Sequence, residues 1–383
     1  MTSTLLRPPV SGTVITDVQA IPLRVPFKTA FKFSQGERAS AEIVLVRLKA
    51  DSGHEGMGET QAWRRLGSRE TLPGLVSKIE NHFAPLLLGR SPFDISAIMS
   101  DLENELYDSL YAQAAVSDAL YDLQGKILDV PVYHLLGGKC RSSLDMCAPI
   151  SISASIDKTL DSAQRLIERG FKSLLLKIGI DPRQDVKTVA ALRHKFGTDF
   201  TLRVDANASL VFDDAVVLLK KLEPYDIDTA EQPLALHDLH GMAELARRID
   251  IPIMVDESVG KASDLINVIR MRAATVVQTK QAKNGGIWRV RKLWDIAGAA
   301  GMRIYPGNHP SLGFATAAVA HLGASWPGPL LDGPFAMGVS GELVGDVGVS
   351  PLRIEDGTLI VPDGPGLGFI PDEDQIRRYR IDA

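Results

Sequence analysis

Five short apolar runs with polar ends follow one another at similar intervals through the middle of the chain: SLLLKIG (173–179), TLRVDA (201–206), DTAEQ (228–232), IMVDE (253–257) and TVVQTKQ (275–281). Each run has the length of a buried strand, and the amphipathic stretches between the runs have the length of a helix. This alternation is typical of βα units, whose strands form a parallel sheet. The middle of the chain is therefore predicted to belong to the α/β class.

The same alternation extends outward on both sides of this region. Further strands are predicted at residues 146–151, 302–306 and 329–332. Helices are predicted at residues 159–169, 185–196, 212–222, 239–248, 262–271, 287–300 and 314–324. Strands and helices in this number favour a (β/α)8 barrel, a modified TIM barrel, for residues 139–349.

The chain before this barrel follows a different pattern. Residues 14–25 and 41–50 read as strands followed by the turn signal Asp51-Ser52-Gly53. Residues 71–87 and 97–128 carry apolar positions three and four apart, which predicts helices. Residues 1–138 are thus predicted to form an α+β capping domain. The C-terminal segment, residues 350–383, has short strands and a Pro/Gly-rich stretch, and we expect it to pack back on that domain.

Composition excludes several classes of protein. The 383 residues carry a net charge of -5 without a basic stripe, so we expect no nucleic-acid partner. The chain has two cysteines, Cys140 and Cys147, and no CxxC pair, so neither a disulfide framework nor a thiolate zinc site is indicated. No apolar stretch has membrane-spanning length and the N-terminus has no secretory pattern, so we expect a cytoplasmic protein with no membrane partner.

Ionisable residues stand at the ends of five successive predicted strands: Lys177, Asp205, Glu231, Asp256 and Lys280. The intervals from Asp205 onward are 26, 25 and 24 residues, about one βα unit each. In a (β/α)8 barrel the C-terminal strand ends converge on one mouth, where the active site lies. These five side chains are therefore predicted to meet.

Three carboxylates in one mouth need a counter-charge, because their repulsion would otherwise raise at least one pKa sharply. Asp205, Glu231 and Asp256 suit Mg²⁺, one ion per site, which takes oxygen ligands and leaves positions for substrate; Mn²⁺ is the alternative ion. The competing interpretation is a set of ordinary salt bridges to the loops.

The two lysines flank the three acids and would face each other across the metal. A partly desolvated lysine near a dication can act as a general base. Lys177 and Lys280 are thus predicted to remove a proton from one face of a substrate carbon and return it from the other, although a single strand-end lysine can also be a solvated rim charge.

These motifs resemble the enolase superfamily, in the muconate lactonizing enzyme subgroup. The resemblance rests on the stretches GFKSLLLKIG (170–179), VDAN (204–207), EQP (231–233), VDES (255–258) and KQAKNGG (280–286), together with a Gly56-Met57-Gly58-Glu59 turn in the capping domain. It implies magnesium at the three acids, the two lysines as acid/base pair, and abstraction of a proton alpha to a carboxylate through an enediolate, as is general for this superfamily. The family's Lys-x-Lys pair is broken here, because Leu175 replaces its first lysine.

The substrate is predicted to be a small-molecule carboxylate, and the protein a homo-oligomeric isomerase. Asp332 occupies a position like the one where dipeptide epimerases of this subgroup hold an ammonium group, which favours a racemase or epimerase of an amino-acid derivative or dipeptide; Asp332 could equally cap a turn. A muconate-type cycloisomerase or a dehydratase is the alternative, and a Schiff-base aldolase or a binding-only barrel is less favoured. Other expected substrate contacts are Asn207, Glu257, His309, Phe31 and Phe33, although the histidine could be a capped loop residue and the phenylalanines could pack the domain interface.

Overall fold

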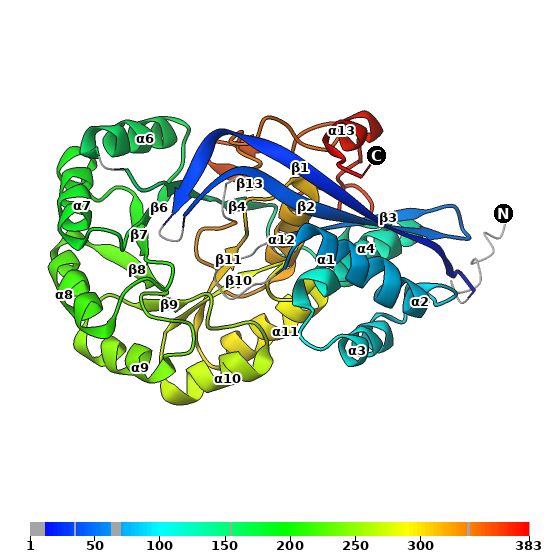
Figure 1. Ribbon diagram of the computed structural model, residues 1–383, viewed down its shortest axis with the longest axis horizontal. Helices are drawn as coiled ribbons and strands as arrows, with labels where there is room; N and C mark the ends of the chain where they lie inside the picture. The colour runs from blue at the N-terminus through cyan, green and yellow to red at the C-terminus, as the bar shows by residue number, and fades with distance from the viewer. Residues whose placement is uncertain (1–11, 34–35, 63–69, 154, 335–337, 383) are drawn as a thin grey trace, which may run out of the picture.

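The computed structural model describes residues 12–33, 36–62, 70–153, 155–334 and 338–382; the side chains of residues 31–33 lie outside the description as well. Figure 1 shows two parts side by side. One is a ring of helices around a curled sheet, and the other is a smaller unit built from both ends of the chain.

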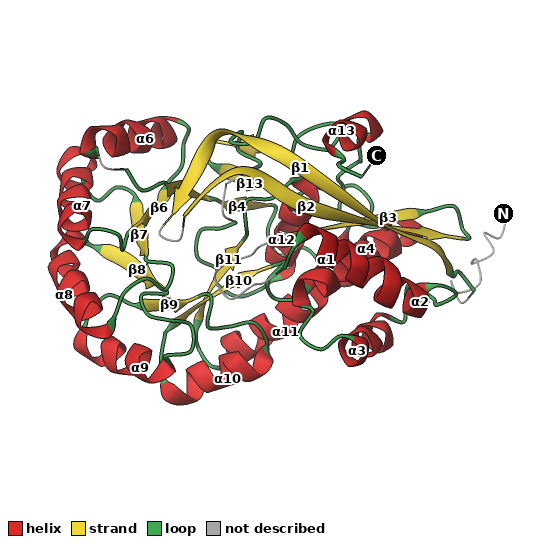
Figure 2. Cartoon of the chain, viewed as in Figure 1, coloured by secondary structure: helices red, strands yellow, loops and turns green. Residues whose placement is uncertain are grey.

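The curled sheet contains parallel strands in the order β11-β10-β9-β8-β7-β6-β5. Their bounds are β5 (Cys147–Ile150), β6 (Ser173–Lys177), β7 (Thr201–Asp205), β8 (Ile227–Glu231), β9 (Ile253–Val255), β10 (Val276–Lys280) and β11 (Arg303–Gly307). The helices outside the sheet are α6 (Ile156–Glu168), α7 (Pro182–Phe196), α8 (Phe212–Leu222), α9 (Leu239–Arg248), α10 (Ala262–Met271), α11 (Gly286–Ala299) and α12 (Gly313–Ser325) (Figure 2). The predicted α/β barrel is confirmed, with element bounds close to those expected.

The register of the sheet brings the polar strand ends to one level. Lys177 pairs with Asp205, and Asp205 pairs with Glu231. Strand β9 ends one residue before Asp256, and β10 ends at Lys280. Because all these strands are parallel, the five polar ends open on the same side of the sheet.

The predicted eighth strand at residues 329–332 is wrong. This segment fills the gap between β11 and β5 without forming a ladder: Leu331 N donates to Ile304 O at 2.8 Å, and Cys147 N donates to Pro334 O at 3.2 Å. Pro329 and Pro334, which bracket the segment, have no amide hydrogen to donate, which limits regular pairing there.

The capping part begins with an antiparallel sheet of β1 (Ile15–Phe33), β2 (Gly36–Ala50) and β3 (Glu55–Gln61). The predicted strands at residues 14–25 and 41–50 correspond to the first part of β1 and the last part of β2, which pair with each other. The turn at Asp51-Ser52-Gly53 joins β2 to β3. The Gly56-Met57-Gly58-Glu59 segment is not a turn, because it lies within β3. There the two glycines face α4 (Leu110–Leu128): a Cβ on Gly58 would come 2.0 Å from Ala115 O, and one on Gly56 would come 2.2 Å from Ala119 O.

The helical stretches of the cap are more broken than predicted. Residues 71–87 form α1 (Leu72–Ser77), a π-helical turn (Lys78–Phe83) and α2 (Ala84–Leu87), with prolines in the first turns of α1 and α2. Residues 97–128 form two helices, α3 (Ile95–Glu105) and α4, which are separated where Asp108 adopts a positive φ of 61°. A short helix, α5 (Val132–Leu135), follows.

The C-terminal tail packs on the cap, as predicted. Its strands β12 (Ile354–Glu355) and β13 (Thr358–Ile360) extend from β4 (Ser143–Asp145), and α13 (Glu373–Tyr379) lies against β1. Asp122 of α4 accepts a hydrogen bond from Leu367 N at 2.7 Å. No helix within the described ranges is long and apolar enough to cross a membrane.

Candidate active site

The structure brings the five predicted strand-end residues together in one buried cluster. Lys177 forms an ion pair with Asp205, and Lys280 forms one with Asp256. Glu231 lies between these pairs and interacts electrostatically with all four of the other residues. The sheet order explains this arrangement, because β6 and β10 flank the three strands that position the acids.

Glu231 is the most exceptional member of the cluster. It is 1% exposed, and neither of its carboxylate oxygens has a hydrogen-bond partner among the described residues. Burial raises the pKa of Glu231 well above its usual value, and the neighbouring Asp205 and Asp256 raise it further. Such a group is costly in a folded protein unless something compensates it.

In the ion pairs that flank Glu231, attraction between opposite charges outweighs the effect of burial on Asp256, Lys177 and Lys280. Burial opposes ionisation of Asp256, but the ammonium groups of Lys280 and Lys283 outweigh burial and hold its pKa well below the usual range. Burial likewise favours neutral lysines, but the acids outweigh it, so the pKa values of Lys177 and Lys280 are raised. Both lysines are therefore charged when the carboxylates have no other counter-ion.

Two side chains next to the acids fix their orientation. Asn207, at a positive φ of 46°, donates to Asp205 from its backbone N at 2.7 Å and from Nδ2 at 2.9 Å. Gln232 accepts from the backbone N of Asp256 at 3.0 Å through Oε1. Gln232 was not predicted as a site residue, although its place directly after Glu231 was a usable signal.

Glu257 also lies in this network. Its Oε1 accepts from Asn207 Nδ2 at 3.4 Å, and burial, followed by the charges of Asp256 and Asp205, raises its pKa to about 8. Asn207 and Glu257, which were predicted to contact substrate, thus lie beside the acids, and Asn207 hydrogen-bonds directly to Asp205.

His309 is buried next to the cluster. Its ring lies 5.8 Å from that of Tyr111 of the cap. Burial lowers the pKa of His309 well below 6.5, and the positive charge of Lys280 lowers it further. The imidazole is therefore neutral near pH 7.

Asp332 is not brought into the cluster. Its carbonyl accepts from Arg203 Nη1 at 2.8 Å, and its carboxylate lies 4.0 Å from the same guanidinium. Its other charged neighbours, Asp145, Asp228 and Lys172, stand before or at the beginnings of strands, at the opposite end from the acids. Asp332 therefore lies partly exposed beside Arg203, away from the five strand-end residues. The side chains of Phe31 and Phe33 lie outside the described residues.

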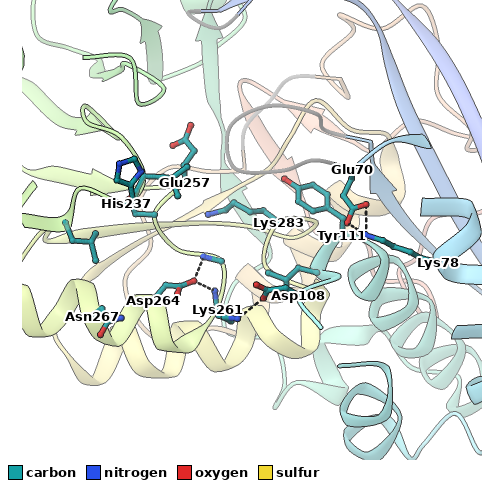
Figure 3. A pocket seen from close by; sticks show the side chains of 15 residues that line it. Glu70, Lys78, Asp108, Tyr111, His237, Glu257, Lys261, Asp264, Asn267 and Lys283 are labelled. Carbon is teal, nitrogen blue, oxygen red and sulfur yellow. Dashed lines mark hydrogen bonds and ion pairs between the residues drawn. The ribbon is translucent and has the colours of Figure 1, made fainter. Parts of the chain in front are cut away.

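Two cavities border the cluster. A cavity of about 770 Å³ lies between the cap and the barrel; Figure 3 shows Glu257 and Lys283 on its barrel side and Tyr111, Glu70 and Lys78 on its cap side. A smaller cavity of about 260 Å³ reaches Lys177 from the side of α6 and α7. Both cavities reach residues of the strand-end cluster or residues adjacent to it, so a small ligand has room there.

The carboxylates fit a divalent cation by their chemistry. They are hard oxygen donors, and Glu231 offers two buried oxygens without partners. Within the described residues no three His, Cys, Asp or Glu side chains converge as a ready metal centre. Two of the acids are instead paired with lysines, Asp205 with Lys177 and Asp256 with Lys280.

Known proteins match nearly the whole chain. Residues 12–137 match the model of the mandelate racemase/muconate lactonizing enzyme N-terminal domain, and residues 158–375 match that of the enolase C-terminal domain-like family. The chain belongs to the mandelate racemase/muconate lactonizing enzyme family of the enolase superfamily. Members of this family are generally dependent on a divalent metal, and this chain is an isomerase of that superfamily.

The curated relatives of this family member catalyse different isomerisations. The chain is 31% identical to chloromuconate cycloisomerase of Cupriavidus pinatubonensis, over 93% of this chain and 95% of the relative. It is also 31% identical to L-Ala-D/L-Glu epimerase of Bacillus subtilis, over 92% and 94%. The crystal structure of N-succinyl Arg/Lys racemase from Bacillus cereus superposes with a TM-score of 0.91 at 27% identity, covering 96% of this chain and 98% of that one. Family membership thus establishes the reaction class and leaves the substrate open.

Proposed function

We propose that this protein is a racemase or epimerase of an amino-acid derivative or dipeptide, working by reversible removal of the proton alpha to a carboxylate. The observation that carries the proposal is the placement of Lys177 and Lys280 on the two strands that flank the three acids. Two amines on opposite sides of one substrate carbon can exchange its proton from both faces, which inverts the configuration.

Asp205, Glu231 and Asp256 would hold the cation, with Mg²⁺ as the ion and Mn²⁺ as a substitute. When bound, this cation would offset the carboxylates that now keep both lysines protonated and would stabilise negative charge on the substrate carboxylate. Asn207 keeps Asp205 oriented through two hydrogen bonds, and Gln232 does so for the backbone of Asp256.

The lysines carry out the proton transfers. One lysine, as the neutral amine, takes the alpha proton, and the other, as the ammonium, returns a proton to the opposite face. Leu175 is buried where the family's first lysine stands, so Lys177 lacks that positive neighbour. The positive charge of Lys280 is a neighbour that lowers the pKa of Lys177, although burial and the acids act more strongly on it.

A muconate-type cycloisomerase is the second candidate. This candidate is supported by sequence identity, because the chain is 31% identical to chloromuconate cycloisomerase and equally 31% identical to the L-Ala-D/L-Glu epimerase. The same lysine that abstracts a proton can donate one to an enediolate, so the cluster suits both reactions.

Proton exchange in D2O separates these candidates. We expect a panel of N-acyl amino acids and dipeptides to contain a compound whose alpha proton exchanges in the presence of Mg²⁺, measured by NMR, with activity lost in a chelator and restored by Mg²⁺. Muconate lactonisation without alpha exchange in the panel would establish the cycloisomerase instead. Activity that survives chelation, together with trapping of a substrate by borohydride, would establish Schiff-base chemistry and contradict both.

A further inference from the structure

A third buried lysine lies next to the cluster and has no role in the proton transfers. Lys283 is three residues after Lys280, in the loop between β10 and α11, and it is 8% exposed. Its ammonium group donates to Asp256 O at 2.5 Å and to Val259 O at 2.7 Å, and lies 3.0 Å from Asp256 Oδ1. Figure 3 shows this side chain at the barrel wall of the large cavity, on the same side as Glu257.

The main chain holds Lys283 in place. Two of its contacts are backbone carbonyls of the loop that follows β9, and Asn284 Nδ2 binds the same loop at Val259 O and Gly260 O, both at 2.9 Å. Asn284 Oδ1 also accepts from the backbone N of Lys280 at 2.8 Å. The loop after β10 therefore ties a catalytic lysine to the loop after β9.

Lys280 and Lys283 hold different oxygens of the same carboxylate. Lys280 binds Asp256 Oδ2 and is held there by a single hydrogen bond among the described residues, so it can leave for a substrate. Lys283 is beside Oδ1 and cannot follow without breaking two backbone hydrogen bonds. Among the described residues, Oδ1 thus accepts no hydrogen bond and lies in an ion pair with an ammonium group that the main chain holds, whereas Oδ2 accepts the hydrogen bond of Lys280.

We propose that Lys283 is the positioning residue of Asp256: it fixes one carboxylate oxygen so that the other can pass from Lys280 to the cation. This inference rests on the proposed function. Groups that orient a metal ligand in this way typically contribute a factor of 10 to 100 in metal affinity.

The test is a metal titration of the metal-free protein, independent of turnover. We expect Lys283→Met to weaken Mg²⁺ and Mn²⁺ binding by about tenfold or more, measured by calorimetry and by Mn²⁺ paramagnetic resonance. Lys283→Gln keeps side-chain donors without the charge and should lie between wild type and Lys283→Met. If Lys283→Met does not fold, the Gln variant carries the test.

Lys126→Met is the matched control. Lys126 also binds one carboxylate, Asp122 at 2.7 Å, and one carbonyl, Glu55 O at 3.0 Å, but lies in the cap. We expect Lys126→Met to lower the melting temperature without changing the metal dissociation constant of the folded protein.

Unchanged or tighter metal binding in both Lys283 variants would overturn the inference, because Lys283 would then be only a packing residue or a repulsive charge. A wild-type protein that binds neither ion would overturn the metal assignment in the proposed function, and this inference with it. Normal metal binding without alpha exchange on any substrate would overturn the reaction and leave the role of Lys283 intact.

Discussion

At the scale of single residues, the cluster places a buried acid without hydrogen bonds between two ion pairs. Both oxygens of the buried Glu231 carboxyl group lack hydrogen-bond partners among the described atoms, so hydrogen bonds do not offset the free-energy cost of burying it. An unpartnered buried carboxyl group of this kind is typical of a functional site, and this supports the proposed role of Glu231 in cation binding.

Replacement of this carboxylate should separate stability from function. We expect Glu231→Gln to leave the metal-free protein at least as stable as wild type, and up to about 1 kcal/mol more stable, because a buried carboxyl group that is costly to ionise is replaced by a neutral amide. We expect metal binding to be lost. Calorimetry in the presence of a chelator measures the first effect, and metal titration the second; the exposed Glu244→Gln serves as the control. Large destabilisation with intact metal binding would show that Glu231 is a structural acid.

At the scale of elements, acids of the cap accept hydrogen bonds from the first turns of barrel helices. Glu59 of β3 accepts from Leu312 N at 2.8 Å and from Ala315 N at 2.9 Å at the start of α12. Asp118 of α4 accepts from Ile287 N at 2.8 Å at the start of α11 and also binds Gln281, the residue after Lys280. The cap is thereby fixed to the strand end that bears Lys280.

These contacts predict a pH-dependent stability. Burial raises the pKa of Glu59 to about 8 and that of Asp118 to about 7, well above their values in the unfolded chain. A group with a raised folded pKa contributes its full stability below the unfolded pKa and loses it as pH rises through the folded pKa. We expect the free energy of unfolding to fall as pH rises from about pH 4, near the unfolded pKa values, to about pH 8, the folded pKa of Glu59. Urea denaturation across this range should show a shallower slope for Asp118→Asn, and an equal slope in both proteins would contradict the assignment.

The contact between β3 and α4 depends on glycine. A Cβ on Gly58 would meet the backbone of Ala115 at 2.0 Å, which no side-chain rotation relieves. We expect Gly58→Ala to lower the free energy of unfolding by about 1–3 kcal/mol or more, measured in urea. Gly12, where an added Cβ meets nothing within 4 Å, is the control, and Gly12→Ala should have no effect. Equal stability of the two variants would contradict the close packing.

The sequence permitted prediction of the barrel and of its five strand-end residues because each signal is local: an apolar run, a polar end and one βα interval. Residues that act across elements could not be found in this way. Lys283 contacts a loop more than 20 residues earlier in the chain, and Asp118 reaches a helix of the other part of the molecule. The position of Asp332 was predicted wrongly because a local pattern suggested a strand at residues 329–332. Two prolines and isolated hydrogen bonds make this segment irregular instead.

At the scale of the whole molecule, the tail joins the cap to the barrel. Phe369 is 3% exposed and packs edge-on against Phe314 of α12, with ring centroids 4.8 Å apart. The same tail binds α4 through Leu367. One short segment thus contacts both parts, so we expect them to unfold together.

The packing of the tail between cap and barrel can be tested at the adjacent residues Phe369 and Ile370. We expect Phe369→Ala to lower the free energy of unfolding by about 3–5 kcal/mol, because it empties a buried aromatic site between the parts. Ile370→Ala, at a residue 68% exposed, should change it little. Urea denaturation followed by two probes should show one shared transition in wild type. Similar effects of the two substitutions would contradict a buried joint at Phe369.

In the proposed reaction, Lys177 and Lys280 serve opposite faces of one substrate carbon. The most direct measurement follows the alpha proton of each enantiomer of a turned-over substrate by NMR in D2O, with Lys177→Ala and Lys280→Ala. We expect both variants to lose racemisation while folding normally, and each to exchange only the enantiomer whose proton faces the remaining lysine. A Lys280→Ala protein that racemises at the wild-type rate would contradict it.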